Sequence, residues 1–471
     1  MAAAQVKVVF TTKHTDIELP EEKRQLVVPS DIKRYGLSQI LNHSDMLATS
    51  HPIPFDFLIN GSFLKGTLAE HLERSGISLE GTVTLDYVPS LLPPFYENSF
   101  LHEDWVSDVD VLSSTSPAVK ALLAKQDGEG EFDVASERLL SASYDKLLRV
   151  WDRSGQMLAV SPDAANGGHR RRVNTAKFLS PTKIVSAGIE GTVLVWEYAE
   201  TAGRGTLKPV LELCAHADQI RDISVHHASG KFLTASSDGR VGLWTASRKA
   251  APAYEAPEQT SRSTKRVKSS VKLQQRGPLA MATVSDKPVT AAIFHPSDAS
   301  VAYASSMDGS VRTVDLATQK IVSSLTTMHP LRCLAALTNS PLLAAGTTAR
   351  HITLIDPRQS AATTSVMTLR GHLGWVESVS ASPENEYSLV SGSWDSTCKI
   401  WDLRSVRAGT KEEGGGRVCD EVVYTIPRES MKDAKVKPDG NGGKVLRVRW
   451  DASWGIISGG EDRQVQINKV G

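Results

Sequence analysis

The chain has 471 residues, 40% of them hydrophobic, which is enough for about two or three domains with packed cores. Its 53 lysines and arginines balance 53 aspartates and glutamates, so no global charge directs it to nucleic acid or to a membrane surface. The four cysteines form no CxxC pair, which favours free thiols in a reducing compartment over a zinc site. The N-terminus lacks a signal peptide and no run approaches the ~18 apolar residues of a membrane span, so we expect a soluble intracellular protein.

The first 90 residues predict a small domain of mixed strands and helices. A helix over residues 31–42 is expected to be capped by the hydroxyl of Ser30, and a second, short helix is expected to end at Gly76. The order of strands and helices is that of a ubiquitin-like β-grasp. The segment has no Gly-Gly tail, so we do not expect it to be conjugated to other proteins. Strands are expected over residues 5–12, 24–30, 55–61 and 82–88.

Seven similar strings follow at a spacing of roughly 40 residues, and such a period indicates an array of equal units. Each string is expected to form a strand, a tight turn and a second strand, because small residues, an acidic residue or glycine, and alternating apolar residues follow one another. A preceding strand and a connecting outer strand bring each unit to four strands, and seven such units form a β-propeller. The strings occupy residues 139–152, 184–197, 232–244, 301–316, 342–357, 389–402 and 456–470.

The predicted fold is therefore mainly β and has three parts. Residues 93–100 are expected to supply the outer strand of the last blade, because the final string leaves no residues for one. Two stretches break the period, at about 245–286 and 405–441, and are predicted to be insertions. The three parts are a ubiquitin-like domain over residues 1–90, a linker with the ring-closing strand over residues 91–104, and a seven-bladed propeller over residues 105–471.

The first insertion carries a cluster of basic residues, Arg262, Lys265, Arg266 and Lys268. It is polar and has no buried pattern, so we expect a mobile loop. Such a cluster can act as a nuclear import signal, contact an RNA backbone or belong to a merely soluble loop, and these alternatives stay open. The second insertion is rich in glycine and charge, which is typical of a flexible linker, and we assign it no chemistry.

From about residue 100 onward, the repeats resemble those of the WD-repeat family. The resemblance implies one buried hydrogen-bonded network per blade, whose complete set here is His372, Ser391, Asp395 and Trp401. A buried carboxylate needs such partners, because its desolvation is otherwise costly. A histidine, an aspartate and a serine could also form a hydrolase triad. Because the pattern recurs with the blades, we favour a structural network and expect no enzymatic activity.

Three features together point to a smaller family among the WD-repeat proteins. They are the β-grasp domain, the propeller and the junction LLPPFYENSFLHEDWVSDVDV (residues 91–111). The whole chain is similar to the WD-repeat subunits of PeBoW-type complexes, and its first domain to the Notchless-type N-terminal domain. This family acts in the nucleus, in nucleolar and nucleoplasmic maturation of the large ribosomal subunit. The resemblance implies that the propeller binds the block-of-proliferation WD protein, which binds pescadillo. It also implies that midasin, an AAA ATPase, grips the ubiquitin-like domain and uses ATP to pull the complex off the preribosome.

The resemblance further implies one functional carboxylate. Glu80 matches by position the acidic residue that coordinates the metal of the midasin adhesion site, and Gly81 beside it would allow close approach. A hard cation such as Mg²⁺ with an open coordination position prefers an oxygen ligand. Without the resemblance, a solvated loop glutamate would be the simpler interpretation, and Asp86 is the weaker alternative. We expect this chain to hold no metal or cofactor alone, because the ion belongs to the partner.

Aromatic and arginine side chains on the top surface of the propeller are candidates for partner contact, because interface hot spots are enriched in them. The alternative is that Trp375 and Trp394 only pack on each other across blades. The second function class is a ubiquitin-pathway adaptor, whose β-grasp domain would need an apolar patch for its receptors. The surface candidates are Tyr144, Arg172, Arg221, Met307, Trp375 and Trp394.

Overall fold

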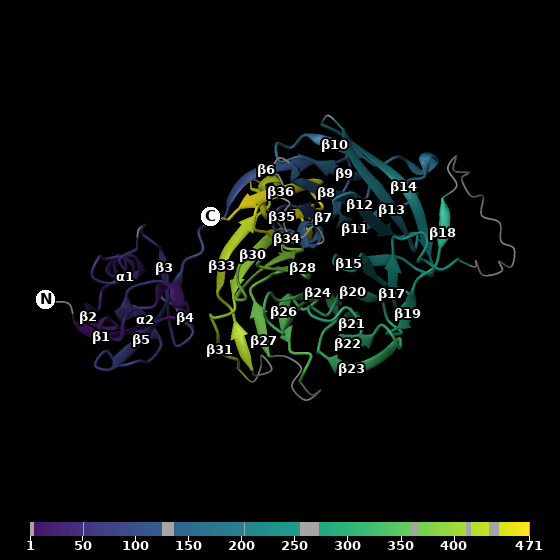
Figure 1. Ribbon diagram of the computed structural model, residues 1–471. Coiled ribbons are helices and arrows are strands. Elements are labelled where there is room, and N and C mark those ends of the chain that lie inside the picture. The colour runs from purple at the N-terminus through teal and green to yellow at the C-terminus, as the bar shows by residue number, and fades with distance from the viewer. Residues whose placement is uncertain are drawn as a thin grey trace. The chain divides into compact units, whose positions relative to one another are not determined.

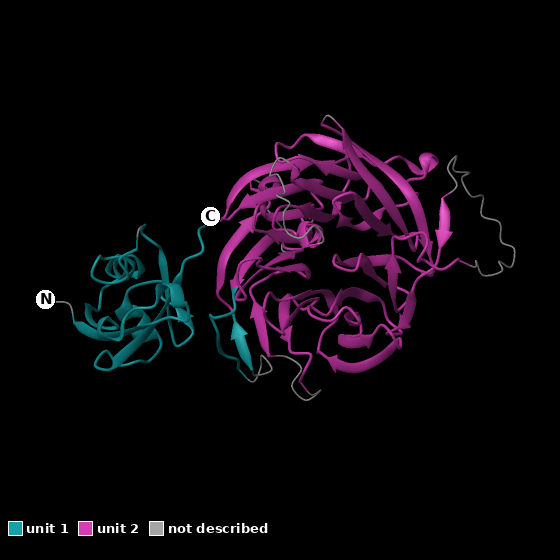
Figure 2. Cartoon of the chain, in the orientation of Figure 1, with its two compact units in different colours: residues 1–93, 402–419, 471 teal, residues 94–401, 420–470 magenta. Residues whose placement is uncertain are grey.

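A computed structural model describes residues 4–49, 51–124, 136–201, 203–254, 273–359, 366–410, 416–432 and 442–470. The chain forms two compact units, shown in different colours in Figure 2. Unit 1 comprises residues 1–93, 402–419 and 471, and unit 2 comprises residues 94–401 and 420–470. No helix of the described residues is long and apolar enough to cross a membrane.

The N-terminal part of unit 1 is a five-stranded sheet in the order β2-β1-β5-β3-β4, accompanied by two helices. Strands β1 and β5 are parallel, and the other neighbours are antiparallel. This is the β-grasp arrangement that the sequence predicted. The elements are β1 (Gln5–Thr11), β2 (Gln25–Pro29), α1 (Arg34–Leu41), β3 (Phe55–Ile59), β4 (Ser62–Phe63), α2 (Leu68–Arg74) and β5 (Thr82–Pro89). Residues 402–419 add the antiparallel pair β31 (Arg407–Ala408) and β32 (Arg417–Cys419).

The core of this sheet forms because alternate residues of each strand face the helices. Val8 and Phe10 of β1 and Leu85 of β5 are fully buried, and so is Leu37 of α1. The ring of Phe10 lies 6.2 Å from that of Tyr87, in an edge-on contact. Each Å² of apolar surface that folding removes from water stabilises the domain by ~25 cal/mol.

The prediction that Ser30 caps the first helix is wrong. Helix α1 begins at Arg34, and its N-cap residue is Lys33, which makes no side-chain cap hydrogen bond. Ser30 stays outside the helix because its backbone is already paired: its N donates to Ala4 O at 2.7 Å, and its O accepts from Ala69 N at 2.8 Å. Tertiary pairing therefore outweighs the local capping preference of the serine.

Unit 2 forms seven sheets from its described residues, and Figure 1 shows them arranged as a ring. We number them blades 1 to 7 in chain order. The first strands of successive blades lie next to each other, and the first strand of blade 7 contacts that of blade 1. The mainly β fold class, a β-grasp domain followed by a WD-repeat propeller, is thus confirmed.

Blade 1 contains β7 (Val106–Leu112), β8 (Arg138–Ser143), β9 (Leu148–Trp151) and β10 (Met157–Val160), with α3 (Pro117–Leu123) after β7. Blade 2 contains β11 (Val173–Ser180), β12 (Lys183–Gly188), β13 (Thr192–Thr201) and β14 (Arg204–Cys214), joined by β18 (Gln274–Arg276). Blade 3 contains β15 (Ile220–His226), β16 (Lys231–Ser236), β17 (Arg240–Thr245) and β19 (Ala280–Thr283). Blade 4 contains β20 (Val289–Phe294), β21 (Val301–Ser306), β22 (Ser310–Asp315) and β23 (Lys320–Thr326).

Blade 5 contains β24 (Leu331–Ala336), β25 (Leu343–Thr347), β26 (His351–Ile355) and β27 (Met367–Arg370). Blade 6 contains β28 (Val376–Ala381), β29 (Ser388–Ser393), β30 (Thr397–Asp402) and β33 (Val422–Pro427). Blade 7 contains β34 (Val445–Asp451), β35 (Gly455–Gly460), β36 (Gln464–Lys469) and β6 (Phe95–Leu101). Strand β6 pairs antiparallel with β36, so a segment from before blade 1 completes the last blade and removes an open sheet edge.

Both predicted insertions contain the outer strand of a blade, which corrects their description as loop and linker. Strand β19 falls within the stretch 245–286 and pairs with β17, and β33 falls within 405–441 and pairs with β30. These outer strands are partly exposed, so they lack the regular apolar alternation that reveals a strand in sequence. The basic residues Arg262, Lys265, Arg266 and Lys268 lie outside the described residues.

Arg428, directly after β33, also contradicts the view of the second insertion as a flexible linker. Its side chain is 1% exposed. It donates to both carboxylate oxygens of Asp462 in blade 7, at 2.9 and 2.8 Å, and to Ser458 Oγ at 2.6 Å. This forked ion pair connects blades 6 and 7, and removing one partner would leave an uncompensated buried charge.

Candidate functional site

The structure brings His372, Ser391, Asp395 and Trp401 together in blade 6. His372 Nδ1 lies 2.7 Å from Asp395 Oδ2, and His372 Nε2 lies 2.7 Å from Ser391 Oγ. Trp401 Nε1 donates to the same hydroxyl at 2.8 Å. Ser391 is fully buried and both histidine nitrogens are occupied, so the serine has no access to a substrate. The grouping is a structural network that joins the loop before β28 to two strands of the blade.

The resemblance implies one such network per blade, and related networks do occur in other blades. In blade 3, His216 lies 2.7 Å from Thr234 Oγ1 and 2.9 Å from Asp238, so a threonine replaces the serine. In blade 1, His102 Nε2 lies 2.7 Å from Ser141 Oγ. The sequence signal for His102 was missed because this residue lies in the segment interpreted as the linker. His329 makes no such bond among the described contacts; its ring lies 5.3 Å from that of His351.

Buried histidines make the stability of the ring dependent on pH. Burial lowers the pKa values of His102 and His351 to about 4, and it lowers the pKa of His372 although Asp395 opposes this. A histidine with a lowered folded pKa is protonated first in the unfolded chain, so its stabilisation is present above pH ~6.5 and is lost as the pH falls. We expect the free energy of unfolding to drop by about 1 kcal/mol for each of His102 and His351 between pH 7 and pH 5.5.

Urea unfolding at these two pH values measures that change. The variant His102→Gln removes one titrating group and should show a smaller difference between the two pH values than the wild type. An equal or larger difference would mean that His102 does not contribute in this way.

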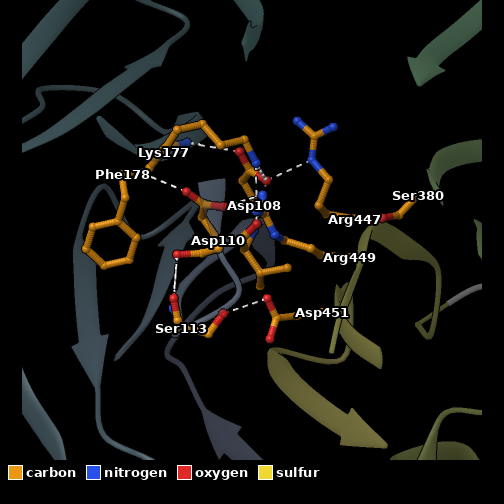
Figure 3. A network of polar contacts seen from close by, with 12 residues as sticks. Asp108, Asp110, Ser113, Lys177, Phe178, Ser380, Arg447, Arg449 and Asp451 are labelled. Carbon is orange, nitrogen blue, oxygen red and sulfur yellow. Dashed lines mark hydrogen bonds and ion pairs between the residues drawn. The ribbon is translucent and has the colours of Figure 1, made fainter. Parts of the chain in front are cut away.

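An ion network lies at the inner strands of the ring (Figure 3). The carboxylate of Asp108 in blade 1 lies 2.7 Å from Arg447 Nε of blade 7 and 2.8 Å from Lys177 Nζ of blade 2. Arg447 also donates to Asp222 of blade 3 at 2.6 Å. Arg449, two residues along β34, forms a second ion pair with Asp110. The network thereby connects blades 7, 1, 2 and 3, and the Arg447–Asp222 pair joins blades 7 and 3, which are not neighbours.

The electrostatic environment keeps this network ionised. Burial alone would raise the pKa of Asp108, but Arg447 and Lys177 outweigh burial and hold the pKa below its usual value. Burial would likewise lower the pKa of Arg447, but the carboxylates of Asp108 and Asp222 raise it above its usual value. A buried ion pair of this kind is costly to break, because the remaining partner becomes an uncompensated charge.

Two cavities of about 240 and 310 Å³ both have Asp222 and Arg447 in their walls, so this ion pair borders both cavities. We call the smaller one the mouth cavity. Tyr144, Arg172 and Arg221, three of the surface candidates, line it. The centre of the Arg172 guanidinium lies 4.7 Å from the centre of the Tyr144 ring, which is a cation–π contact.

The other three surface candidates do not line the mouth cavity. Trp375 and Trp394 stack with ring centres 4.3 Å apart, and both belong to blade 6, so they do not pack across blades as the alternative assumed. Arg332, which lines the cavity, lies 5.4 Å from the Trp375 ring. Met307 lies apart, in the turn between β21 and β22 of blade 4.

Glu80 lies in the loop between α2 and β5, and its side chain is exposed. Its backbone N donates to Ser78 Oγ at 3.2 Å, and its carboxylate makes no ion pair with the described residues. The turn before it is fixed, because Gly76 has φ +66°, its N donates to Glu73 O and Ile77 N donates to Leu72 O at 2.9 Å. The loop therefore presents an exposed carboxylate, with no ion-pair partner among the described residues, just after a turn that backbone hydrogen bonds hold in place.

Gly81 is not required by the backbone. Its φ is not in the left-handed region, and a Cβ at this position would have Ser78 O, at 3.7 Å, as its nearest neighbour. Asp86, the alternative ligand, lies inside β5 opposite Leu58 of β3. Burial raises the pKa of Asp86, so its surroundings disfavour the charged form that binds a metal. Among the described residues, no group of three or more His, Cys, Asp or Glu side chains is placed to hold a metal ion.

Comparison with known sequences connects these features to a family. The chain matches the NLE (NUC135) domain over residues 6–72, and the WD domain, G-beta repeat, over residues 207–245 and 363–402. It is 54% identical to the ribosome biogenesis protein ytm1 of Neurospora crassa, over 99% of this chain and 97% of the relative. The chain belongs to this family of ribosome biogenesis proteins. The family resemblance stated from the sequence is therefore confirmed.

Other members of the Ytm1 family match to a similar extent. The ribosome biogenesis protein YTM1 of Chaetomium thermophilum is 54% identical, over 99% of this chain and 96% of the relative. That of Aspergillus oryzae is 47% identical, over 99% of this chain and 95% of the relative. The match covers both units, so the β-grasp domain and the propeller occur together in the family.

Proposed function

We propose that this chain is a non-catalytic assembly factor for maturation of the large ribosomal subunit, including rRNA processing, in the nucleolus and nucleoplasm. Its propeller binds a block-of-proliferation-type WD protein, which in turn binds a pescadillo-type protein on the preribosomal particle. Its β-grasp domain is gripped by the AAA ATPase midasin, which uses ATP to release the complex. Membership of a family of ribosome biogenesis proteins supports the setting.

The observation that supports the release step is the exposed carboxylate of Glu80. A metal in an adhesion site keeps one coordination position open, and a carboxylate oxygen from a partner suits Mg²⁺ at that position. Glu80 forms no ion pair with the described residues that would have to break before it binds, and Leu79 beside it is 38% exposed and offers apolar contact area. Gly81, whose backbone does not need glycine, leaves space for the approaching partner. The metal stays with the ATPase, and this chain supplies one ligand.

The ubiquitin-adaptor alternative is less well supported. A receptor for ubiquitin-like domains needs a contiguous apolar patch. In the β-grasp domain, the exposed large apolar residues Val27, Tyr35 and Leu79 lie on three different elements. The exposed residues of β1 and β5 include Lys7 and Thr84, which are polar.

Purification of the tagged full-length chain from nuclear extract tests the proposed function. We expect precursors of the large ribosomal subunit to be recovered with it, and depletion of the chain to increase the precursors of large-subunit rRNA without changing those of the small subunit. Recovery of ubiquitin receptors in place of preribosomes, with normal levels of rRNA precursors, would contradict the proposal.

A further inference from the structure

In the lining of the mouth cavity, positively charged side chains outnumber negatively charged ones. Four guanidinium groups line it, those of Arg172, Arg221, Arg332 and Arg447, and Arg447 is paired with Asp222. Arg332 is paired with Glu377, to which it donates at 2.9 and 2.6 Å. In the described residues, no carboxylate lies within ion-pair distance of the other two guanidinium groups.

The two unpaired arginines have donors to spare. Arg172 is exposed and rests on the Tyr144 ring, and it makes no side-chain hydrogen bond to any described residue. Arg221 uses Nε to donate to Ser237 Oγ at 2.7 Å, which orients the guanidinium and leaves its two terminal nitrogens available. Burial and the positive charge of Arg332 lower the pKa of Arg221, because both disfavour the charged form of its guanidinium. An anion bound beside Arg221 would stabilise that charged form.

The shape and composition of the cavity favour a carboxylate over a nucleic-acid phosphate. A space of about 240 Å³ admits one side chain or a short stretch of extended peptide. Nucleic acid, in contrast, binds to an extended basic groove. Four arginines against the two carboxylates of Glu377 and Asp222 leave two uncompensated positive charges in the lining, which suits one carboxylate better than a chain of phosphates. One carboxylate can accept two parallel hydrogen bonds from the guanidinium of Arg221. The Tyr144 ring adds the kind of surface found in protein interfaces.

We propose that the mouth cavity is a docking site for an Asp or Glu side chain on an extended acidic loop of a partner protein. The carboxylate lies between Arg172 and Arg221, and the loop backbone passes over Tyr144. The Arg447–Asp222 ion pair closes the base of the site, so the loop does not pass on into the second cavity. This site is independent of the role proposed for Glu80.

Fluorescence anisotropy at low ionic strength tests the site with the full-length chain. The probe is a labelled octapeptide in which glycine and serine flank four glutamates, and its counterpart has four glutamines. We expect the double variant Arg172→Gln/Arg221→Gln to weaken binding of the glutamate peptide at least about tenfold. The matched control Arg170→Gln/Arg171→Gln makes the same charge change at exposed neighbours outside the cavity and should bind like the wild type.

A labelled single-stranded RNA serves as the competing probe, and the thermal unfolding midpoint confirms that the variants are folded. If the double variant proves unstable, the exposed single change Arg172→Gln should still weaken peptide binding. The proposal is overturned if the glutamate peptide does not bind, if the glutamine peptide binds equally well, if the control variant loses binding to the same extent, or if the RNA depends more strongly than the peptide on the two arginines.

Discussion

Glu80→Ala is expected to leave the protein folded and bound to preribosomes but to abolish its ATP-driven release. The side chain is exposed and pairs with no charged group in the part of the chain that the structure describes, so its removal should change the free energy of unfolding by less than about 0.5 kcal/mol. The variant lacks the oxygen that would complete the coordination of the partner's metal. The fraction of the chain released from purified preribosomes after addition of midasin and ATP measures the effect.

Glu73→Ala is the matched control for that experiment. Glu73 is an exposed glutamate on helix α2, so its removal makes the same charge change on the same domain. It should be released like the wild type. Glu80→Asp keeps the carboxylate but shortens it, and we expect partial release. Wild-type release of Glu80→Ala would mean that the ATPase grips this chain in another way.

Asp108→Ala is expected to lower the free energy of unfolding of the propeller by about 3–5 kcal/mol. The substitution leaves Arg447 with only Asp222 and leaves Lys177 without its ion-pair partner, at a site where Asp108 is fully buried. Urea unfolding followed by tryptophan fluorescence measures the change. Asp108→Asn keeps the shape and removes the charge, so it should have an intermediate effect.

Asp286→Ala provides the reference for an aspartate without such a role, because Asp286 is exposed. Its unfolding curve should overlay that of the wild type. An Asp108→Ala variant that also unfolds like the wild type would show that the network at the inner strands contributes little to the stability of the ring.

The parts of the fold that were predictable from sequence are those that repeat. The string ending in Trp401 contains a serine, a turn aspartate and a tryptophan at fixed spacing, and the structure joins them through His372. This short-range spacing is visible in the sequence because every blade packs in the same way. His102 escaped detection because it lies in the segment interpreted as the linker, 39 residues before its partner Ser141.

The ion network could not be predicted, because it depends on the closed ring. Arg447 and Asp222 are 225 residues apart, and only the arrangement of seven blades brings them within 2.6 Å. Likewise, nothing near Arg428 in the sequence indicates that its guanidinium is buried against Asp462 of the next blade. Local sequence patterns predict the strands and turns, whereas contacts between distant blades become visible only in the tertiary structure.

The most direct test of the release mechanism is binding of the full-length chain to the adhesion domain of midasin. Titration calorimetry would compare the wild type, Glu80→Ala and Glu73→Ala in Mg²⁺ and after chelation. We predict that wild type and Glu73→Ala bind in Mg²⁺, and that binding is lost both on chelation and in Glu80→Ala. Binding that is unchanged by chelation and by Glu80→Ala would contradict the assignment of Glu80 as the ligand of the partner's metal.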